Sequence, residues 1–223
     1  MSVEDWLADT RASYDTLAPA YADHVRDLLD QTPYERAILA VFAELARADG
    51  GGPVADVGCG PGRITAHLAG LGVDAFGIDL SPAMIEVARR EHPALRFEVG
   101  SMTDLDLAEA SLAGVVAWYS LIHIPDHEIG SVLARFHRAL RPGSPLLIGF
   151  HVGDDVQLKT RGYGDHPINV QVHRRRPEQL ATWLDETGFD VQAQMTLRSA
   201  ESSLGGILVA LRRPDAGPGK PEA

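Results

Sequence analysis

The chain has 223 residues, 45% of them hydrophobic, which is typical of one globular domain with a substantial core. Its formal net charge of −11 argues against a phosphate-backbone partner, because nucleic-acid binders normally carry a basic surface. The single cysteine, Cys59, excludes an internal disulfide and a cysteine-based zinc site. No apolar leader and no run of about 18 apolar residues is present, so we expect no membrane span and a cytoplasmic location.

The first residues, 1–48, are predicted to be helical. Tyr14, Ala18 and Tyr21 recur at the i, i+4, i+7 spacing of one helix face. That face either covers the core or places its tyrosines against a ligand, and both interpretations stay open. A second helix is predicted to begin after Thr32, with the threonine as its cap.

The stretch from Val54 to Asp79 combines a short apolar strand, a glycine-rich turn, a helix and a second strand with an acidic end. Glycines at positions 58, 60 and 62 let the backbone approach a ligand where a Cβ would block it. The helix that follows offers unpaired N–H groups and a positive dipole end. In a doubly wound sheet the acidic end of the second strand binds a ribose, so Asp79 predicts a nucleoside-containing ligand.

The spacing of this turn departs from a dinucleotide-binding fingerprint. The fingerprint needs a small residue three positions after its second glycine, so that helix and strand pack closely, and Arg63 stands there. Asp56 lies just before the turn, where a carboxylate repels a pyrophosphate but attracts a sulfonium or ammonium group. A nicotinamide-dependent oxidoreductase is therefore the less favoured interpretation.

The run from Asp56 to Arg63, followed by Asp79, closely resembles motif I of the class I S-adenosylmethionine-dependent methyltransferases. The resemblance implies a Rossmann-like three-layer α/β sandwich with a seven-stranded, mostly parallel sheet whose last strand is antiparallel. It implies S-adenosyl-L-methionine as cofactor, with the glycine loop around its methionine part and Asp79 on its ribose hydroxyls. Tyr14 resembles the family's cap tyrosine, whose hydroxyl reaches the cofactor carboxylate.

Two later segments resemble the same family. Ser101 stands where relatives usually carry an aspartate that contacts adenine, so the resemblance implies a weaker contact there. The run 118–126 lies at the C-terminal end of the fourth predicted strand, where open α/β sheets bind ligands. It lacks the Asn/Asp-Pro-Pro-Tyr/Phe sequence of nucleobase-amino methyltransferases, which argues against DNA or RNA bases as substrates. The predicted cofactor-binding residues are Tyr14, Asp56, Gly58, Cys59, Gly60, Gly62, Arg63, Asp79, Leu80, Ser81, Met84, Gly100, Ser101, Met102, Trp118, Tyr119 and Ser120.

Residues 151–176 are the least regular part of the second half. Alternating apolar segments predict a two-stranded insert after the fifth strand, which either hangs over the ligand end of the sheet or is a peripheral hairpin or dimer contact. The expected organisation is one methyltransferase domain at 1–213, containing a helical cap at 1–48, a cofactor-binding core at 53–150 and the insert at 151–176, followed by a disordered tail at 214–223.

Methyl transfer to a hydroxyl requires a group that takes up its proton, and histidine suits that role because its pKa lies near neutral pH. Of the nine histidines, His123 is the first catalytic candidate, as a base or as a donor that orients the acceptor; a hydrogen-bonded wall residue is the alternative. His151, directly after the fifth strand, is the second. No acidic cluster accompanies them, so no metal site is predicted. The arginines at 174–176 are the only candidate basic patch.

The sequence thus predicts an enzyme that transfers a methyl group from S-adenosylmethionine to a nitrogen or oxygen of a small-molecule acceptor. The alternatives are an NAD(P)-dependent oxidoreductase and a S-adenosylmethionine-binding protein without methyl transfer. We expect no nucleic-acid or membrane partner, and a monomer or homodimer.

Overall fold

The structure, a computed structural model, describes residues 3–198 and 204–214, so the predicted tail beyond Pro214 lies outside the described residues. The helices are α1 (Val3–Val25), α2 (Pro33–Arg47), α3 (Arg63–Gly70), α4 (Pro82–Glu91), α5 (Asp126–Ala139) and α6 (Pro177–Glu186), with 3₁₀ turns η1 (Leu28–Gln31), η2 (Ala48–Gly50), η3 (Met102–Asp104), η4 (Leu121–His123) and η5 (Tyr163–Asp165). The strands are β1 (Pro53–Val57), β2 (Asp74–Asp79), β3 (Arg96–Val99), β4 (Gly114–Trp118), β5 (Pro145–His151), β6 (Val156–Arg161), β7 (Pro167–His173), β8 (Phe189–Arg198) and β9 (Leu204–Arg212).

The main sheet has seven strands in the order β3-β2-β1-β4-β5-β9-β8. Strands β1 to β5 pair in parallel, and β9 pairs antiparallel with both β5 and β8. This confirms the expected Rossmann-like architecture, including the antiparallel last strand. The strand order reverses between β1 and β4, which is where open α/β sheets form their ligand crevice.

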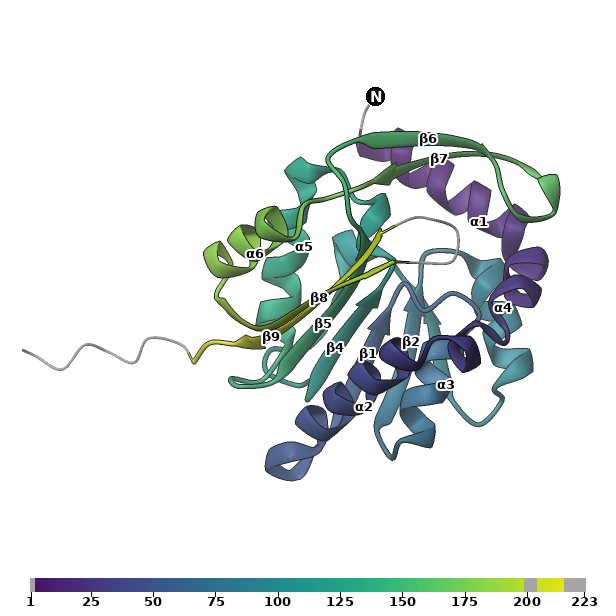
Figure 1. Cartoon of the computed structure of the whole chain (residues 1–223). Coiled ribbons are helices and arrows are strands. Elements are labelled where there is room, and N and C mark those ends of the chain that lie inside the picture. The colour runs from purple at the N-terminus through teal and green to yellow at the C-terminus, as the bar shows by residue number, and fades with distance from the viewer. Residues whose placement is uncertain (1–2, 199–203, 215–223) are drawn as a thin grey trace, which may run out of the picture.

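Helices cover both faces of this sheet, which makes the three layers visible in Figure 1. The five residues of β4 are all buried, as expected for a parallel strand that is covered on both sides. Phe42 of α2 and Leu68 of α3 belong to the core on one face, whereas Phe136 of α5 and Leu184 of α6 belong to the core on the other.

The predicted insert is the separate two-stranded sheet of β6 and β7, and it lies together with α1 across one end of the main sheet (Figure 1). Asn169 of β7 joins the two elements: its backbone N–H donates to Ser13 Oγ (2.9 Å), and its side-chain amide donates to Asp9 Oδ2 (2.7 Å). On the other side of α1, the Ser81 hydroxyl donates to Asp15 Oδ1 (2.6 Å). The helix is therefore held between the core and the hairpin.

The start of α2 differs from the prediction. Thr32 precedes the helix and Pro33 takes its first position, but the threonine side chain makes no cap bond to the helix N–H groups. Its hydroxyl points back to the carbonyl of Leu28 (3.1 Å), at the end of the preceding chain segment. Proline has no N–H to satisfy, which lowers the need for a cap. Among the described residues, no helix is both long and apolar enough to cross a membrane.

Candidate functional site

The sheet topology places the glycine turn and the segment after β4 side by side. Val54 to Asp56 pair in register with β4, so both strands end at the same edge. Ser120, two residues beyond β4, donates its hydroxyl to the carbonyl of Val57 (2.6 Å), which ties the two loops together. The backbone N–H of Gly58 donates to Ile78 of β2 (2.7 Å). The turn is thus anchored on both sides at the carboxyl end of the sheet.

A cavity of about 670 Å³, counted with its open mouth, lies over this edge of the sheet. Most of the predicted site residues come together in its wall, namely Tyr14, Gly58, Gly60, Asp79, Leu80, Met84, Gly100, Ser101, Met102, Trp118, Tyr119, Ser120 and His123. The wall is completed by Trp6, Leu7, Thr10, Tyr21 and Ile124.

Asp79, at the end of β2, supplies the only carboxylate in the described part of this wall. Its Oδ2 accepts the backbone N–H of Gly60 and its Oδ1 accepts that of Ser81, both at 2.8 Å. Each carboxylate oxygen keeps a second lone pair, so two hydroxyls of a ribose can still bind. Burial raises the pKa of Asp79 to about 6, and the two N–H bonds act in the opposite direction.

Other predicted residues support the glycine turn from behind and do not line the cavity. The thiol of Cys59 packs against Ile85 and Phe97 under the turn. Gly62 precedes α3 with a positive φ of 84°. The Ser81 hydroxyl accepts the N–H of Met84 (3.1 Å) and caps α4. These residues shape the loop, and their predicted contact with the cofactor stays a prediction.

Asp56 and Arg63 also lie outside the cavity wall, and each has a buried side-chain atom without a hydrogen-bond partner among the described residues, Oδ1 of the aspartate and Nη1 of the arginine. The Asp56 side chain is 0% exposed, and its Oδ2 accepts the Thr65 hydroxyl at 2.7 Å. Burial raises the pKa of Asp56 to about 7. Buried groups normally find partners, and an ammonium and a carboxylate, as in the methionine part of the expected cofactor, are the groups that complement an acceptor and a donor of this kind.

Gly58 is the position in the turn where a side chain is least tolerable. Its φ is 80°, and a Cβ there would stand 2.2 Å from the Cβ of Ser120. We predict that Gly58→Ala lowers the free energy of unfolding by about 2–5 kcal/mol, from the left-handed backbone and the overlap. Gly130→Ala is the matched control, because nothing lies within 4 Å of that exposed helical position. Urea unfolding measures both; an equal midpoint for the two variants would contradict the prediction.

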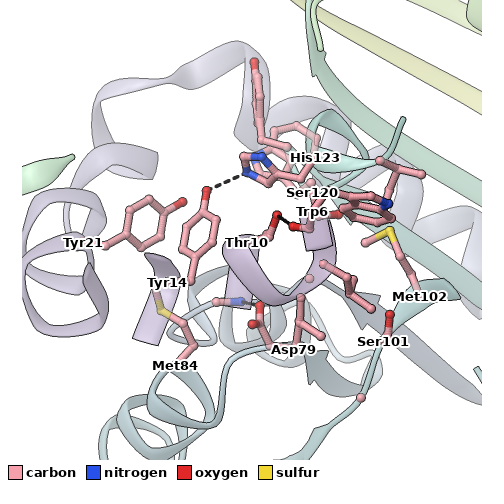
Figure 2. Close-up of a pocket in the computed structure, with 18 residues that line it drawn as sticks. Trp6, Thr10, Tyr14, Tyr21, Asp79, Met84, Ser101, Met102, Ser120 and His123 are labelled. Carbon is pink, nitrogen blue, oxygen red and sulfur yellow. Dashed lines mark hydrogen bonds between the residues drawn. The ribbon is translucent and has the colours of Figure 1, made fainter. Parts of the chain in front are cut away.

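Tyr14 and His123 form a hydrogen-bonded pair in the wall, with 2.7 Å between the Tyr14 hydroxyl and His123 Nε2 (Figure 2). His123 Nδ1 lies 2.9 Å from the carbonyl oxygen of Gln171, which can only accept. Nδ1 therefore carries the proton, and Nε2 of the neutral ring accepts from Tyr14. Burial lowers the pKa of His123 to about 4, which keeps the ring neutral. Both ring nitrogens are engaged, so Nε2 has no proton to donate; the roles of base and of hydrogen-bonded wall residue both stay open.

His151, the second catalytic candidate, ends β5 outside the cavity wall. Its ring lies against Tyr119, with 5.1 Å between the ring centroids. Burial lowers its pKa, and the charges of Arg174 and Lys159 act in the same direction. In residues 3–198 and 204–214, no group of three or more His, Cys, Asp or Glu side chains is placed to hold a metal ion.

The predicted adenine side contains Met84, Ser101 and Met102 in the same wall. Ser101 caps η3: its hydroxyl oxygen accepts the N–H of Thr103 (3.2 Å) and lies 2.7 Å from the Thr103 hydroxyl. Two local bonds thus occupy most of its hydrogen-bonding capacity. When the hydroxyl donates to Thr103, one lone pair of its oxygen stays open to an adenine amine, and the weak contact expected of serine at this position stays a prediction.

The residues that the sequence analysis missed are mainly on α1. Trp6 and Thr10 line the cavity ahead of Tyr14 (Figure 2), and Leu7 belongs to the same wall. Trp6 and Thr10 precede Tyr14 by eight and four residues, so they extend the face of Tyr14 and Tyr21 towards the N-terminus. The sequence signal that could have found them is the helical periodicity of Tyr14 and Tyr21, extended by two turns towards the N-terminus. The Thr10 hydroxyl donates to the Trp6 carbonyl (2.8 Å), inside the helix.

Comparison with known proteins agrees with the geometry. A family model described as "Methyltransferase domain" matches residues 54–143. An O-methyltransferase of Pyrenophora dematioidea is 33% identical over 182 residues, which are 78% of this chain and 67% of that protein. The chain spans 38% to 67% of the length of the first curated relatives it matches.

Solved structures share the fold. One is the structure of 1,6-didemethyltoxoflavin-N1-methyltransferase of Burkholderia thailandensis with S-adenosylhomocysteine bound. Its TM-score is 0.70 at 22% sequence identity, and the match covers 96% of this chain and 92% of that chain. A [4+2]-cyclase has a TM-score of 0.62 at 18% identity and covers 80% of each chain, so the fold alone does not specify methyl transfer. The relative from Pyrenophora, the family match and the glycine turn facing Asp79 together show that the chain belongs to the class I S-adenosylmethionine-dependent methyltransferases.

Proposed function

We propose that this protein transfers a methyl group from S-adenosylmethionine to a nitrogen or oxygen of a small-molecule acceptor. The observation that carries the proposal is one cavity with two chemically distinct sides. Asp79 and the glycine turn stand on one side, and the Tyr14–His123 pair stands on another. The first supplies a cofactor site, and the second supplies a polar group for an acceptor.

When bound, the cofactor supplies an electrophilic methyl on its sulfonium, so the protein mainly has to hold the acceptor in line with it. Orientation of this kind contributes on the order of 7–11 kcal/mol to rate. In our proposal Asp79 and the Gly58–Gly62 turn hold the cofactor, and the other predicted cofactor residues except Tyr14 shape that site. The Tyr14–His123 pair binds the polar atom of the acceptor and receives its proton where the acceptor is a hydroxyl.

The proposal is tested by binding and by product formation. Calorimetry with S-adenosylhomocysteine, NAD and NADP should show micromolar binding of the first alone. Methyl-labelled S-adenosylmethionine should then yield labelled product with members of a panel of phenols and heterocyclic amines. Binding of NAD or NADP instead would favour the oxidoreductase alternative. S-adenosylhomocysteine binding without product across a broad panel would favour a protein that binds the cofactor but does not methylate.

The pKa of Asp79, raised to about 6 by burial, predicts a pH dependence of cofactor binding. Only the ionised carboxylate offers acceptors to both ribose hydroxyls, and the proton competes with them below pH 6. We expect the contribution of Asp79 to S-adenosylhomocysteine affinity to be constant above about pH 7, and its protonation to weaken binding about tenfold at pH 5, one unit below that pKa. Calorimetry between pH 5 and 8 measures this. Asp79→Asn should lose the inflection near pH 6; an inflection retained in that variant would assign it to another group.

We also propose a cytoplasmic protein that acts as a monomer or homodimer without a nucleic-acid partner. The acidic net charge of −11 supports the last point. Size-exclusion chromatography with light scattering tests the oligomeric state, and a salt-dependent gel-shift experiment with RNA and DNA tests the absence of nucleic-acid binding.

A further inference from the structure

The run of three arginines at 174–176 is not a basic patch in the structure. Arg175 is 1% exposed and is among the largest fully buried side chains of the protein. Arg174 is partly buried and donates to the carbonyl of Val152 (2.8 Å), so only Arg176 is exposed. A fully buried guanidinium needs a structural or functional reason, because its desolvation is costly unless its donors are paired.

The guanidinium of Arg175 is paired almost entirely with the segment that carries His123. Its Nη1 donates to the carbonyl of Leu121 (2.9 Å), and its Nη2 donates to the carbonyl of Ile124. These two carbonyls belong to the residues on either side of Ile122 and His123. Its Nε and Nη2 also donate to Oδ1 of Asp126, at 3.0 and 2.9 Å. Four bonds from a group with five donor hydrogens hold η4 and the first residue of α5 together.

The backbone of Arg175 is itself fixed to the main sheet. Its N–H donates to the carbonyl of His151 at the end of β5 (2.9 Å), and its carbonyl accepts the N–H of Gly153 (3.3 Å). Gln171, four residues earlier, provides the carbonyl that accepts from His123 Nδ1 (2.9 Å). Both contacts come from the segment in which β7 of the insert leads into α6 (Figure 1). The insert thus reaches the His123 turn at two points.

We propose that Arg175 is a positioning residue for the acceptor side of the site. It holds the η4 turn in place so that the Gln171 carbonyl can fix the ring of His123, with Nε2 directed at Tyr14. A planar guanidinium can meet two carbonyls and one carboxylate at once, whereas the point charge of a lysine cannot reproduce that fork. The insert is then part of the site rather than a peripheral hairpin. This inference rests on the acceptor-side role of His123 proposed above.

The test compares Arg175→Lys with Arg176→Lys, its exposed neighbour and matched control. Protein labelled with ¹⁵N-histidine is saturated with S-adenosylhomocysteine, and the His123 signals are assigned by their loss in His123→Gln. In the wild type and in R176K we expect one tautomer, with Nδ1 protonated and Nε2 bare. In R175K we expect the Nε2 tautomer to become populated or the signals to broaden by exchange, while S-adenosylhomocysteine affinity stays within about threefold.

Unchanged His123 signals in R175K overturn the proposal, even if the thermal midpoint falls, because a merely structural arginine would lower stability without changing the tautomer. If R175K does not fold, Asp126→Ala replaces it: this variant keeps both carbonyl bonds and removes only the carboxylate, which is half exposed. We expect a smaller shift of the same His123 signals, and no shift again overturns the proposal. These measurements need no acceptor. A failure of the proposed function would instead appear in the wild type, as absent cofactor binding or absent product.

Discussion

Asp79→Ala should weaken S-adenosylhomocysteine binding by more than tenfold, the largest effect on the cofactor that we expect from one side chain. The change removes the acceptors for two ribose hydroxyls, and a desolvated hydroxyl left without a partner costs about 1–3 kcal/mol. It also frees the N–H groups of Gly60 and Ser81, which Asp79 now holds at 2.8 Å each, so the glycine turn loses one of its anchors. Calorimetric titration at pH 7.5 measures the loss.

Asp74→Ala is the matched control, because Asp74 begins the same strand, is exposed and does not line the cavity. Its affinity should equal that of the wild type. Burial raises the pKa of Asp79, so its charge does not favour the folded state at neutral pH, and Asp79→Ala should lose less in stability than in affinity. Unchanged affinity in Asp79→Ala would mean that the ribose binds elsewhere.

His123→Ala should reduce turnover by about 100-fold or more, while S-adenosylhomocysteine affinity stays within a few-fold. A positioned proton acceptor typically contributes 10²–10⁴-fold to rate, and the change also deprives the Tyr14 hydroxyl of its partner. Single-turnover kinetics with the first acceptor methylated in the screen separates the chemical step from binding. Tyr14→Phe, which breaks the same hydrogen bond from the other side, should slow the same step.

Two other histidines serve as comparisons. His127 is exposed at the start of α5, and His127→Ala should leave turnover unchanged. His151 lies outside the cavity wall, so His151→Ala should slow turnover less than His123→Ala. If turnover and cofactor affinity fall equally in His123→Ala, the histidine belongs to the wall of the cofactor site. If His151→Ala has the larger effect, the order of the two catalytic candidates is reversed.

The cofactor side of the site was largely predictable because its determinants are local in sequence. Glycines at fixed spacing, a strand on either side and Asp79 at the second strand end all lie within one βαβ unit, whose handedness and packing admit few arrangements. The capping of α4 by Ser81 was predictable for the same reason. The missing cap bond of Thr32 was not predictable, because capping rules do not include the carbonyl of Leu28, which competes for the threonine hydroxyl.

The acceptor side depends on contacts between residues that are far apart in the chain. Tyr14 and His123 are 109 residues apart, and His123 and Gln171 are 48 apart. Periodicity placed Tyr14 on a helix face but could not say which element the face would meet. It also could not show that Arg175, within an apparently basic run, is buried under the His123 turn.

The sequence by itself determined the glycine turn and the alternation of strands and helices, because backbone geometry and hydrophobic periodicity act over a few residues. The fold class and the cofactor followed from the resemblance of that turn to a family motif. Only the tertiary structure decided the tautomer of His123, the enclosure of the cavity by α1 and the inward direction of Arg175. Each of these depends on which carbonyl or apolar surface a folded neighbour presents. A side chain's partners, and through them its charge state, are properties of the packed molecule rather than of the local chain.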